Sequence, residues 1–216
     1  MTQAPNSGPG ERAGRRGIIF CVFALAAFPI GAQTLEERLE KVLADPAARD
    51  SAAAAAKNLV SFCANCHGGD GNSALGEVPN LAGQHPVYLL AQIEKFTKGQ
   101  RRNRFKEGVM KLLSENDRIN ASVYYSGQIV RPAGAGRSAH GQGLYKRRCV
   151  VCHGAQGRGT QATPRLAGQQ VDYLIQSLSR YRDRTGERIY LPMAAGTAGL
   201  KDPDIKALAV FLSSLP

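Results

Sequence analysis

The sequence Cys63-Ala64-Asn65-Cys66-His67 recurs later in the chain as Cys149-Val150-Val151-Cys152-His153. Each is a C-x-x-C-H motif, the spacing that attaches a c-type haem. Two thiols on one helical turn can each add to a haem vinyl group, and the histidine that follows can supply an axial nitrogen to the iron. The sequence therefore predicts two covalent haem c groups. Their thioether positions are Cys63, Cys66, Cys149 and Cys152, and their axial histidines are His67 and His153.

A long shared pattern surrounds both motifs and makes the chain an internal repeat. Each motif is followed by a glycine-rich loop and by the sequence P-x-L-A-G-Q, at Pro79–Gln84 and Pro164–Gln169. A helix with Tyr-Leu-Leu or Tyr-Leu-Ile, a basic loop and a last helix complete each repeat. Matched positions are 86 residues apart at the first cysteine, 85 at P-x-L-A-G-Q and 87 in the last helix. Since no long alternating apolar stretch occurs, the predicted fold is all-α, with two tandem cytochrome c-like domains.

The predicted domain boundaries follow from this repeat. They are a signal peptide at 1–32, an N-terminal domain at 33–128, a linker at 129–138 and a C-terminal domain at 139–216. An extra helix over 34–44 begins the first domain, because Thr34 and Glu37 form a capping box ahead of an apolar stripe. A second helix is expected to begin at Ser51 and to lead into the first motif.

The first 32 residues have the pattern of a secretory signal. Arg12, Arg15 and Arg16 precede an apolar run from Ile18 to Ile30, and Gly31-Ala32 offers small residues for cleavage. Thirteen apolar residues are short for a membrane span, which needs about 20. Secretion with cleavage is therefore predicted, and an uncleaved N-terminal anchor is the alternative. Cleavage would remove Cys21 and leave only the four cysteines of the motifs.

Apart from the initiator, the chain has two methionines, one in each repeat. Met110 and Met193 each follow a basic loop and precede the last helix. Each is expected to lie on a loop and is predicted to be the sixth ligand of its iron. A thioether favours Fe(II) and raises the reduction potential. The two methionines are 83 residues apart, and Met110 lies three residues before Leu113 whereas Met193 lies seven before Leu200.

Two kinds of supporting residue are also predicted, and two alternative ligands are considered. An axial histidine needs an acceptor for its other ring nitrogen, and the carbonyls of Pro79 and Pro164 are the candidates, 12 and 11 residues after the motif histidines. Arginines of the basic loops could neutralise haem propionates, although most of them are expected to be solvated. His85 and His140 are alternative sixth ligands and are expected to lie at the surface instead.

These features together resemble the cytochrome c4 family, dihaem cytochromes c of the bacterial periplasm. The resemblance rests on both C-x-x-C-H motifs, both P-x-L-A-G-Q segments, both Tyr-Leu helices and a methionine in each half, and it covers roughly Ser51 to Leu215. It implies two class I cytochrome domains whose haems face one another across an interface. It also implies an electron carrier of the respiratory chain rather than an enzyme, working between a quinol-oxidising complex and a terminal oxidase.

The net charge of +11 is unevenly distributed. Residues 33–131 carry 13 Lys and Arg against 11 Asp and Glu, whereas residues 132–216 carry 12 against 5. We therefore expect the C-terminal domain to dock on a redox partner with an acidic surface, or on an anionic membrane face, by attraction that weakens with salt. No nucleic-acid partner is expected.

Other functions remain open at this point. A similar dihaem chain could be the cytochrome subunit of a dehydrogenase, such as a sulfide-oxidising flavoprotein. A dihaem peroxidase needs one haem with an open or displaceable ligand, which the pair of methionines disfavours. A zinc module is disfavoured by the 82 residues that separate Cys66 from Cys149.

Overall fold

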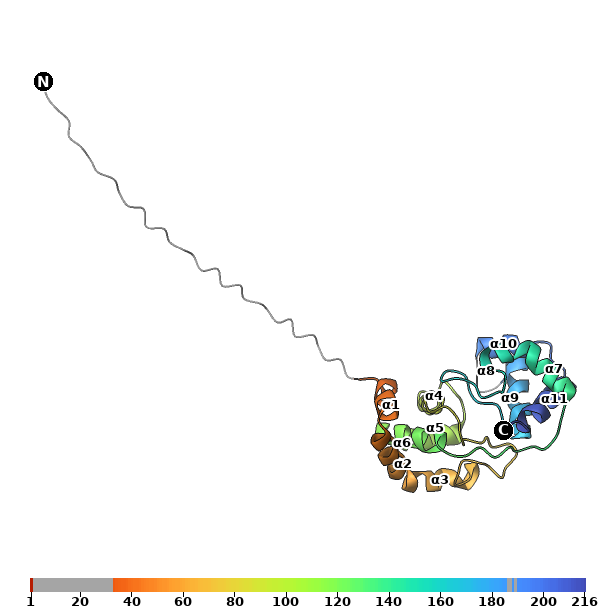
Figure 1. Ribbon diagram of the computed structural model, residues 1–216, viewed down its shortest axis with the longest axis horizontal. Coiled ribbons are helices and arrows are strands. Elements are labelled where there is room, and N and C mark those ends of the chain that lie inside the picture. Colours follow the sequence, from red (N-terminus) through yellow and green to blue (C-terminus); the bar gives the residue numbers. More distant parts are fainter. Residues whose placement is uncertain (2–32, 186–187, 189) are drawn as a thin grey trace. The chain divides into compact units, whose positions relative to one another are not determined.

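The computed structural model describes Met1 and residues 33–216, except for 186, 187 and 189 (Figure 1). The predicted signal peptide, with Cys21, lies outside the described residues. Within the described part the regular elements are all helices, as the sequence predicts. None of the helices in that part is long and apolar enough to cross a bilayer. Residues 33–216 form one compact unit.

The first half of this unit packs around α6. Its helices are α1 (Leu35–Ala44), α2 (Pro46–Ala55), α3 (Lys57–His67), α4 (Pro86–Thr97), α5 (Arg104–Leu112) and α6 (Glu115–Ser126). Helix α6 contacts α2 and α4, and α4 contacts α5. Leu39 of α1 is fully buried with Leu90 and Ile119. The predicted capping box of Thr34 and Glu37 is confirmed at the start of α1.

The second helix begins earlier than the sequence predicts, at Pro46 rather than at Ser51. The carboxylate of Asp45 accepts a hydrogen bond from the Ala47 N–H at 2.9 Å, and the ring of Pro46 fixes φ for the first helical turn. The single residue Ala56 separates α2 from α3, and α3 continues into the first C-x-x-C-H motif, as expected.

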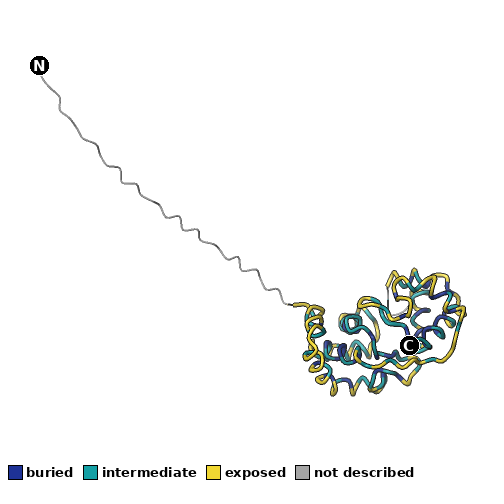
Figure 2. The backbone as a smooth tube through the Cα atoms, in the orientation of Figure 1, coloured by how far each residue is buried: buried dark blue, intermediate teal, exposed yellow. Residues whose placement is uncertain are grey.

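The second half packs around α11. Its helices are α7 (Ala139–Arg148), α8 (Val150–His153), α9 (Val171–Asp183), α10 (Leu191–Thr197) and α11 (Asp202–Ser213). Helix α11 contacts α7 and α9, and its buried residues line their shared core (Figure 2). Gly141 lets α7 approach α11 closely, because a Cβ atom there would lie 2.0 Å from the Ala207 carbonyl oxygen.

The two methionines lie on helices rather than on the predicted loops. Met110 belongs to α5 and Met193 to α10. Helix α5 starts within the basic segment because the Asn103 side chain caps it, accepting from the Lys106 N–H at 3.0 Å. Helix α10 starts at Leu191, two residues before Met193, and Pro192 in its first turn favours this start.

The segment between α6 and α7 is held by both halves. Asn72 donates to the Ile129 carbonyl at 2.9 Å and accepts from the Arg131 N–H at 2.8 Å. Further along, the Gly134 N–H donates to the Ser213 carbonyl at 3.1 Å. The connection is therefore fixed to the first half at one end and to the second half at the other.

Candidate functional site

Each motif histidine is the last residue of a helix. His67 ends α3 and His153 ends α8, and the next residues, Gly68 and Gly154, have φ values of 78° and 77°. This left-handed conformation ends a helix abruptly and favours glycine. At Gly68 a side chain is also excluded by space, since a Cβ atom would lie 2.3 Å from the Asn72 carbonyl oxygen. The chain therefore turns away at once and leaves each imidazole at the end of its helix.

Both imidazoles are buried and held by a backbone carbonyl. The Nδ1 atom of His67 lies 2.8 Å from the Pro79 carbonyl oxygen, and that of His153 lies 3.0 Å from the Pro164 oxygen. The predicted role of these two carbonyls is thus confirmed. Because a carbonyl only accepts, Nδ1 must carry the proton in both histidines.

The protonation of these histidines suits metal ligation. Burial lowers the pKa of His67 to about 4, with a further contribution from the charge of Lys106. Burial also lowers the pKa of His153, although its bond to Pro164 opposes the shift. A neutral imidazole protonated at Nδ1 keeps its lone pair on Nε2, which is the form that binds a metal ion.

The four motif cysteines are free thiols. Cys63 packs against the buried cluster that contains Val60 and Tyr125, and Cys149 packs against the core of the second half. Burial raises the pKa of the Cys63 thiol, and it raises that of Cys149 to about 11. Both therefore stay protonated at neutral pH, available for thioether bonds.

Two arginines of the basic segments form a half-buried cluster with two tyrosines. Arg101 and Arg188 interact electrostatically with both Tyr88 and Tyr173, so the cluster joins the two halves. Burial alone would raise the pKa of Tyr173, but the charges of Arg188 and Arg101 lower it below its usual value. Arg188 donates one hydrogen bond, from Nη1, to the Tyr181 hydroxyl at 3.2 Å. Its Nη2 atom is buried without a hydrogen-bond partner among the described residues.

These residues fit haem c. A buried guanidinium with an unused donor calls for an anion, and haem propionates are carboxylates. The free thiols and the Nε2 lone pairs supply the remaining contacts. Bound there, haem supplies one-electron redox chemistry. Of the other arginines in the basic segments, Arg102, Arg104, Arg180 and Arg184 are exposed, as the sequence predicts, whereas Arg182 is partly buried.

The P-x-L-A-G-Q segments join the two halves through their last residue. Gln84 accepts from the Arg165 N–H at 2.8 Å and donates to the Arg165 carbonyl at 3.0 Å. Gln169 does the same to Asn80, at 2.7 and 3.0 Å. Asn80 and Arg165 directly follow the two prolines that hold the axial histidines. Each half is therefore hydrogen-bonded to the other next to the carbonyl that holds its histidine. The sequence did not predict this role of the two glutamines, although the glutamine occurs in both repeats.

Replacing Gln169 with alanine is expected to destabilise the protein by about 2–4 kcal/mol, since it leaves a buried N–H and a buried carbonyl of Asn80 without partners. Gln169 and Asn80 are only 6% and 5% exposed. Urea unfolding of the haem-loaded protein measures the change. Gln142→Ala, at an exposed position of α7, is the matched control and should stay within about 0.5 kcal/mol of the wild type. Equal stability of the two variants would contradict the role of Gln169.

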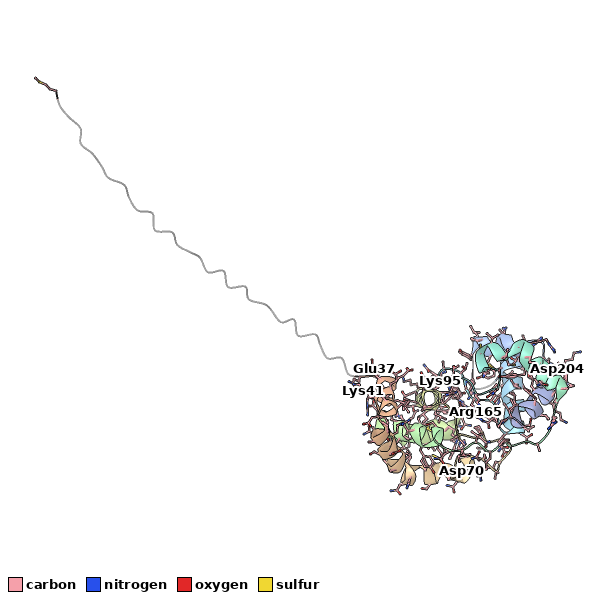
Figure 3. The ribbon with its side chains drawn as sticks, viewed as in Figure 1. Glu37, Lys41, Asp70, Lys95, Arg165 and Asp204 are labelled. Atoms are coloured by element: carbon pink, nitrogen blue, oxygen red, sulfur yellow. The ribbon has the colours of Figure 1, made fainter. Side chains whose placement is uncertain are left out.

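The alternative histidine ligands are engaged elsewhere. The Nε2 atom of His140 lies 2.6 Å from Asp204 at the exposed start of α11 (Figure 3). His85 is partly buried rather than at the surface, and its Nε2 atom lies 2.7 Å from the Arg158 carbonyl oxygen. Both contacts leave these rings occupied by protein groups.

The two methionines predicted as sixth ligands are both partly buried. Met193 packs against the core of the second half, and Met110 is partly buried on α5. Their ligation remains a prediction. Lys106, which the sequence analysis did not single out, places its Nζ atom 3.0 Å from the Nε2 atom of His67. Burial lowers the pKa of this lysine.

Comparison with known proteins agrees with the fold and the motifs. The Cytochrome c family model matches residues 53–118 and 138–216. Cytochrome c4 of Pseudomonas aeruginosa is 33% identical over 183 residues, which are 78% of this chain and 90% of that protein. The thiosulfate dehydrogenase electron acceptor of Thiomonas intermedia is 32% identical over 76% of this chain and 82% of its own length.

Among solved structures, reduced recombinant cytochrome c4 from Pseudomonas stutzeri matches with a TM-score of 0.68 and 28% identity, covering 76% of this chain and 98% of that one. The predictions of two tandem cytochrome c domains, two covalent haem c groups and electron transfer are thereby confirmed. With its paired motifs and its two haem domains, the chain belongs to the dihaem cytochrome c4 family.

Proposed function

We propose that this cytochrome is a periplasmic electron carrier that takes electrons from a quinol-oxidising complex and delivers them to a terminal oxidase. One observation supports the proposal most directly. The two histidine-holding segments are bonded to each other through Gln84 and Gln169. Two haem sites fixed in this way suit the passage of an electron from one haem to the other.

The proposed binding residues follow the repeat. Cys63, Cys66 and His67 hold the first haem, for which the sequence predicts Met110 as the sixth ligand. Cys149, Cys152, His153 and Met193 hold the second haem. The carbonyls of Pro79 and Pro164 orient the imidazoles and raise their basicity. Arg101 and Arg188 offset the charge of the propionates. With six ligands at each iron there is no open position for a substrate, which supports a carrier rather than an enzyme.

The proposed docking surface surrounds the second motif. Val151 is 92% exposed and Cys152 is also exposed, so this edge of the second haem site faces solvent. Lys146 and Arg147 are exposed in the preceding turn of α7. Their charges and the larger positive balance of the second half favour an acidic partner.

The double variant Lys146→Glu, Arg147→Glu is expected to slow electron transfer to an acidic terminal oxidase by about ten-fold or more at low ionic strength, because it reverses the charge that steers the encounter. Stopped-flow oxidation of the reduced protein measures the rate. The rate for the wild type should fall as salt rises, since the Debye length shrinks from about 10 Å at 0.1 M to about 3 Å at 1 M.

Lys57→Glu is the control for this experiment. Lys57 is exposed at the start of α3, in the first half of the unit, and its reversal should change the rate much less. A wild-type rate that stays flat with salt, or an equal effect of Lys57→Glu, would reject docking through the second half.

A second donor is favoured by the relatives. The protein from Thiomonas intermedia that this chain resembles is a thiosulfate dehydrogenase electron acceptor. We therefore propose a thiosulfate dehydrogenase as the alternative source of electrons. Mixing the oxidised cytochrome with each donor enzyme and its substrate, and following haem reduction, separates the two. The physiological donor is the one that reduces the cytochrome faster at equal concentration.

A further inference from the structure

The internal repeat has a constant offset through the segment that carries the predicted sixth ligands. From Arg101 and Arg188 to the end of the unit, matched residues are 87 positions apart. Both arginines lie in the same half-buried cluster with Tyr88 and Tyr173. Leu113 and Leu200 keep this offset and precede the last helix of each half.

The capping carboxylates confirm the offset in three dimensions. Asp117 accepts from the Ser114 N–H at 3.0 Å, and Asp204 accepts from the Lys201 N–H at 2.9 Å. Each carboxylate caps the N-terminus of the last helix of its half, and they too are 87 residues apart. The two halves therefore have one register on both sides of the methionines.

In that register the counterpart of Met193 is Lys106, not Met110. Met110 corresponds to Thr197, a buried residue whose hydroxyl donates to the Met193 carbonyl at 2.8 Å. Met110 thus occupies a position that, in the second half, serves helix packing one turn beyond the ligand position.

The position of the lysine side chain agrees with the register. Its Nζ atom lies 3.0 Å from the Nε2 atom of His67, the ring atom whose lone pair is left free by the Pro79 bond. The Asn103 side chain holds the Lys106 N–H at 3.0 Å and so fixes the first turn of α5. Lys106 therefore places its amine beside the nitrogen through which His67 would bind the iron.

We propose that Lys106, rather than Met110, is the sixth ligand of the haem iron in the first half of the unit, so that this haem has His/Lys ligation and the second has His/Met. This deepens the proposed function, because it rests on haem attachment at both motifs. A lysine amine is a harder donor than a thioether and favours Fe(III). The first haem then has the lower reduction potential, and electrons pass from it to the second haem, next to the basic docking surface.

The test is the far-red absorption band of oxidised haem–methionine ligation, integrated per chain on the purified dihaem protein. The wild type is expected to show the intensity of one haem. Met193→Leu should abolish the band and Met110→Leu should leave it unchanged. Lys106→Met should double it and raise the reduction potential of one haem.

The opposite outcomes are equally clear. A wild-type band of two-haem intensity, or a band halved by Met110→Leu, would overturn the assignment of Lys106. Lys106→Ala gives an independent test, since electron paramagnetic resonance should show one haem turning high-spin. An unchanged low-spin spectrum would also overturn the assignment of Lys106. Haem content, measured on every variant, separates the two proposals. A wild type with two haems and a far-red band of two-haem intensity would contradict only Lys106 as the ligand. A wild type with fewer than two haems would contradict the haem sites on which the proposed function rests.

Discussion

The double variant Cys149→Ala, Cys152→Ala is expected to carry one haem instead of two and to lose the ordered packing of α7–α11. Cys149 packs directly against the core of the second half, and Met193 packs against the same core. A haem attached between them adds a large apolar body to this core. Below about 80 residues a single core rarely contributes more than about 3–5 kcal/mol, so the second half is not expected to stay folded without it.

Haem absorbance per chain and the mass of the purified protein measure the haem content, and far-UV circular dichroism measures the loss of helix. The reciprocal variant Cys63→Ala, Cys66→Ala is the matched control. It should also retain one haem, but with the second half intact. Full helix content in the Cys149, Cys152 variant would show that the core of the second half is stable without its haem.

The Gly141→Ala substitution is expected to destabilise the protein by about 2 kcal/mol, although alanine favours helices. Gly141 lies where α7 crosses α11, and its added methyl group would meet the backbone oxygen of Ala207 at 2.0 Å. Backbone cannot rotate away as a side chain can, so the two helices must separate. Overpacking of this kind costs about 1–3 kcal/mol or more, which outweighs the gain of about 1 kcal/mol from replacing glycine in a helix.

Gly143→Ala, two residues along the same helix, is the control. Its nearest neighbour would be the Arg147 guanidinium at 3.2 Å, the far end of a flexible side chain. This substitution should stabilise the protein by about 0.5–1 kcal/mol. Thermal unfolding of the two variants should therefore shift in opposite directions, with about 2–4 °C for each kcal/mol in a chain of this size. A shift in the same direction would contradict the close approach of α7 and α11.

Features that depend on neighbours along the chain could be predicted from the amino-acid sequence. The C-x-x-C-H motifs placed each histidine at a helix end, and Thr34 with Glu37 placed the start of α1 through a capping box. The spacing from each motif to its proline even identified the carbonyls of Pro79 and Pro164. Such features are fixed by local hydrogen bonds and helix geometry, which a short stretch of residues specifies.

Contacts between residues distant in sequence could not be predicted, because they depend on how the chain folds. Gln84 and Gln169 look like solvent-facing amides in the sequence, yet each satisfies backbone groups of the other half because the two segments are buried against one another. The sequence also predicted Met110 as a ligand, from its residue type and its place between a basic loop and the last helix. Only folding brings Lys106 to His67, across 39 residues, because α5 is capped at Asn103 and thereby directs the lysine toward the end of α3.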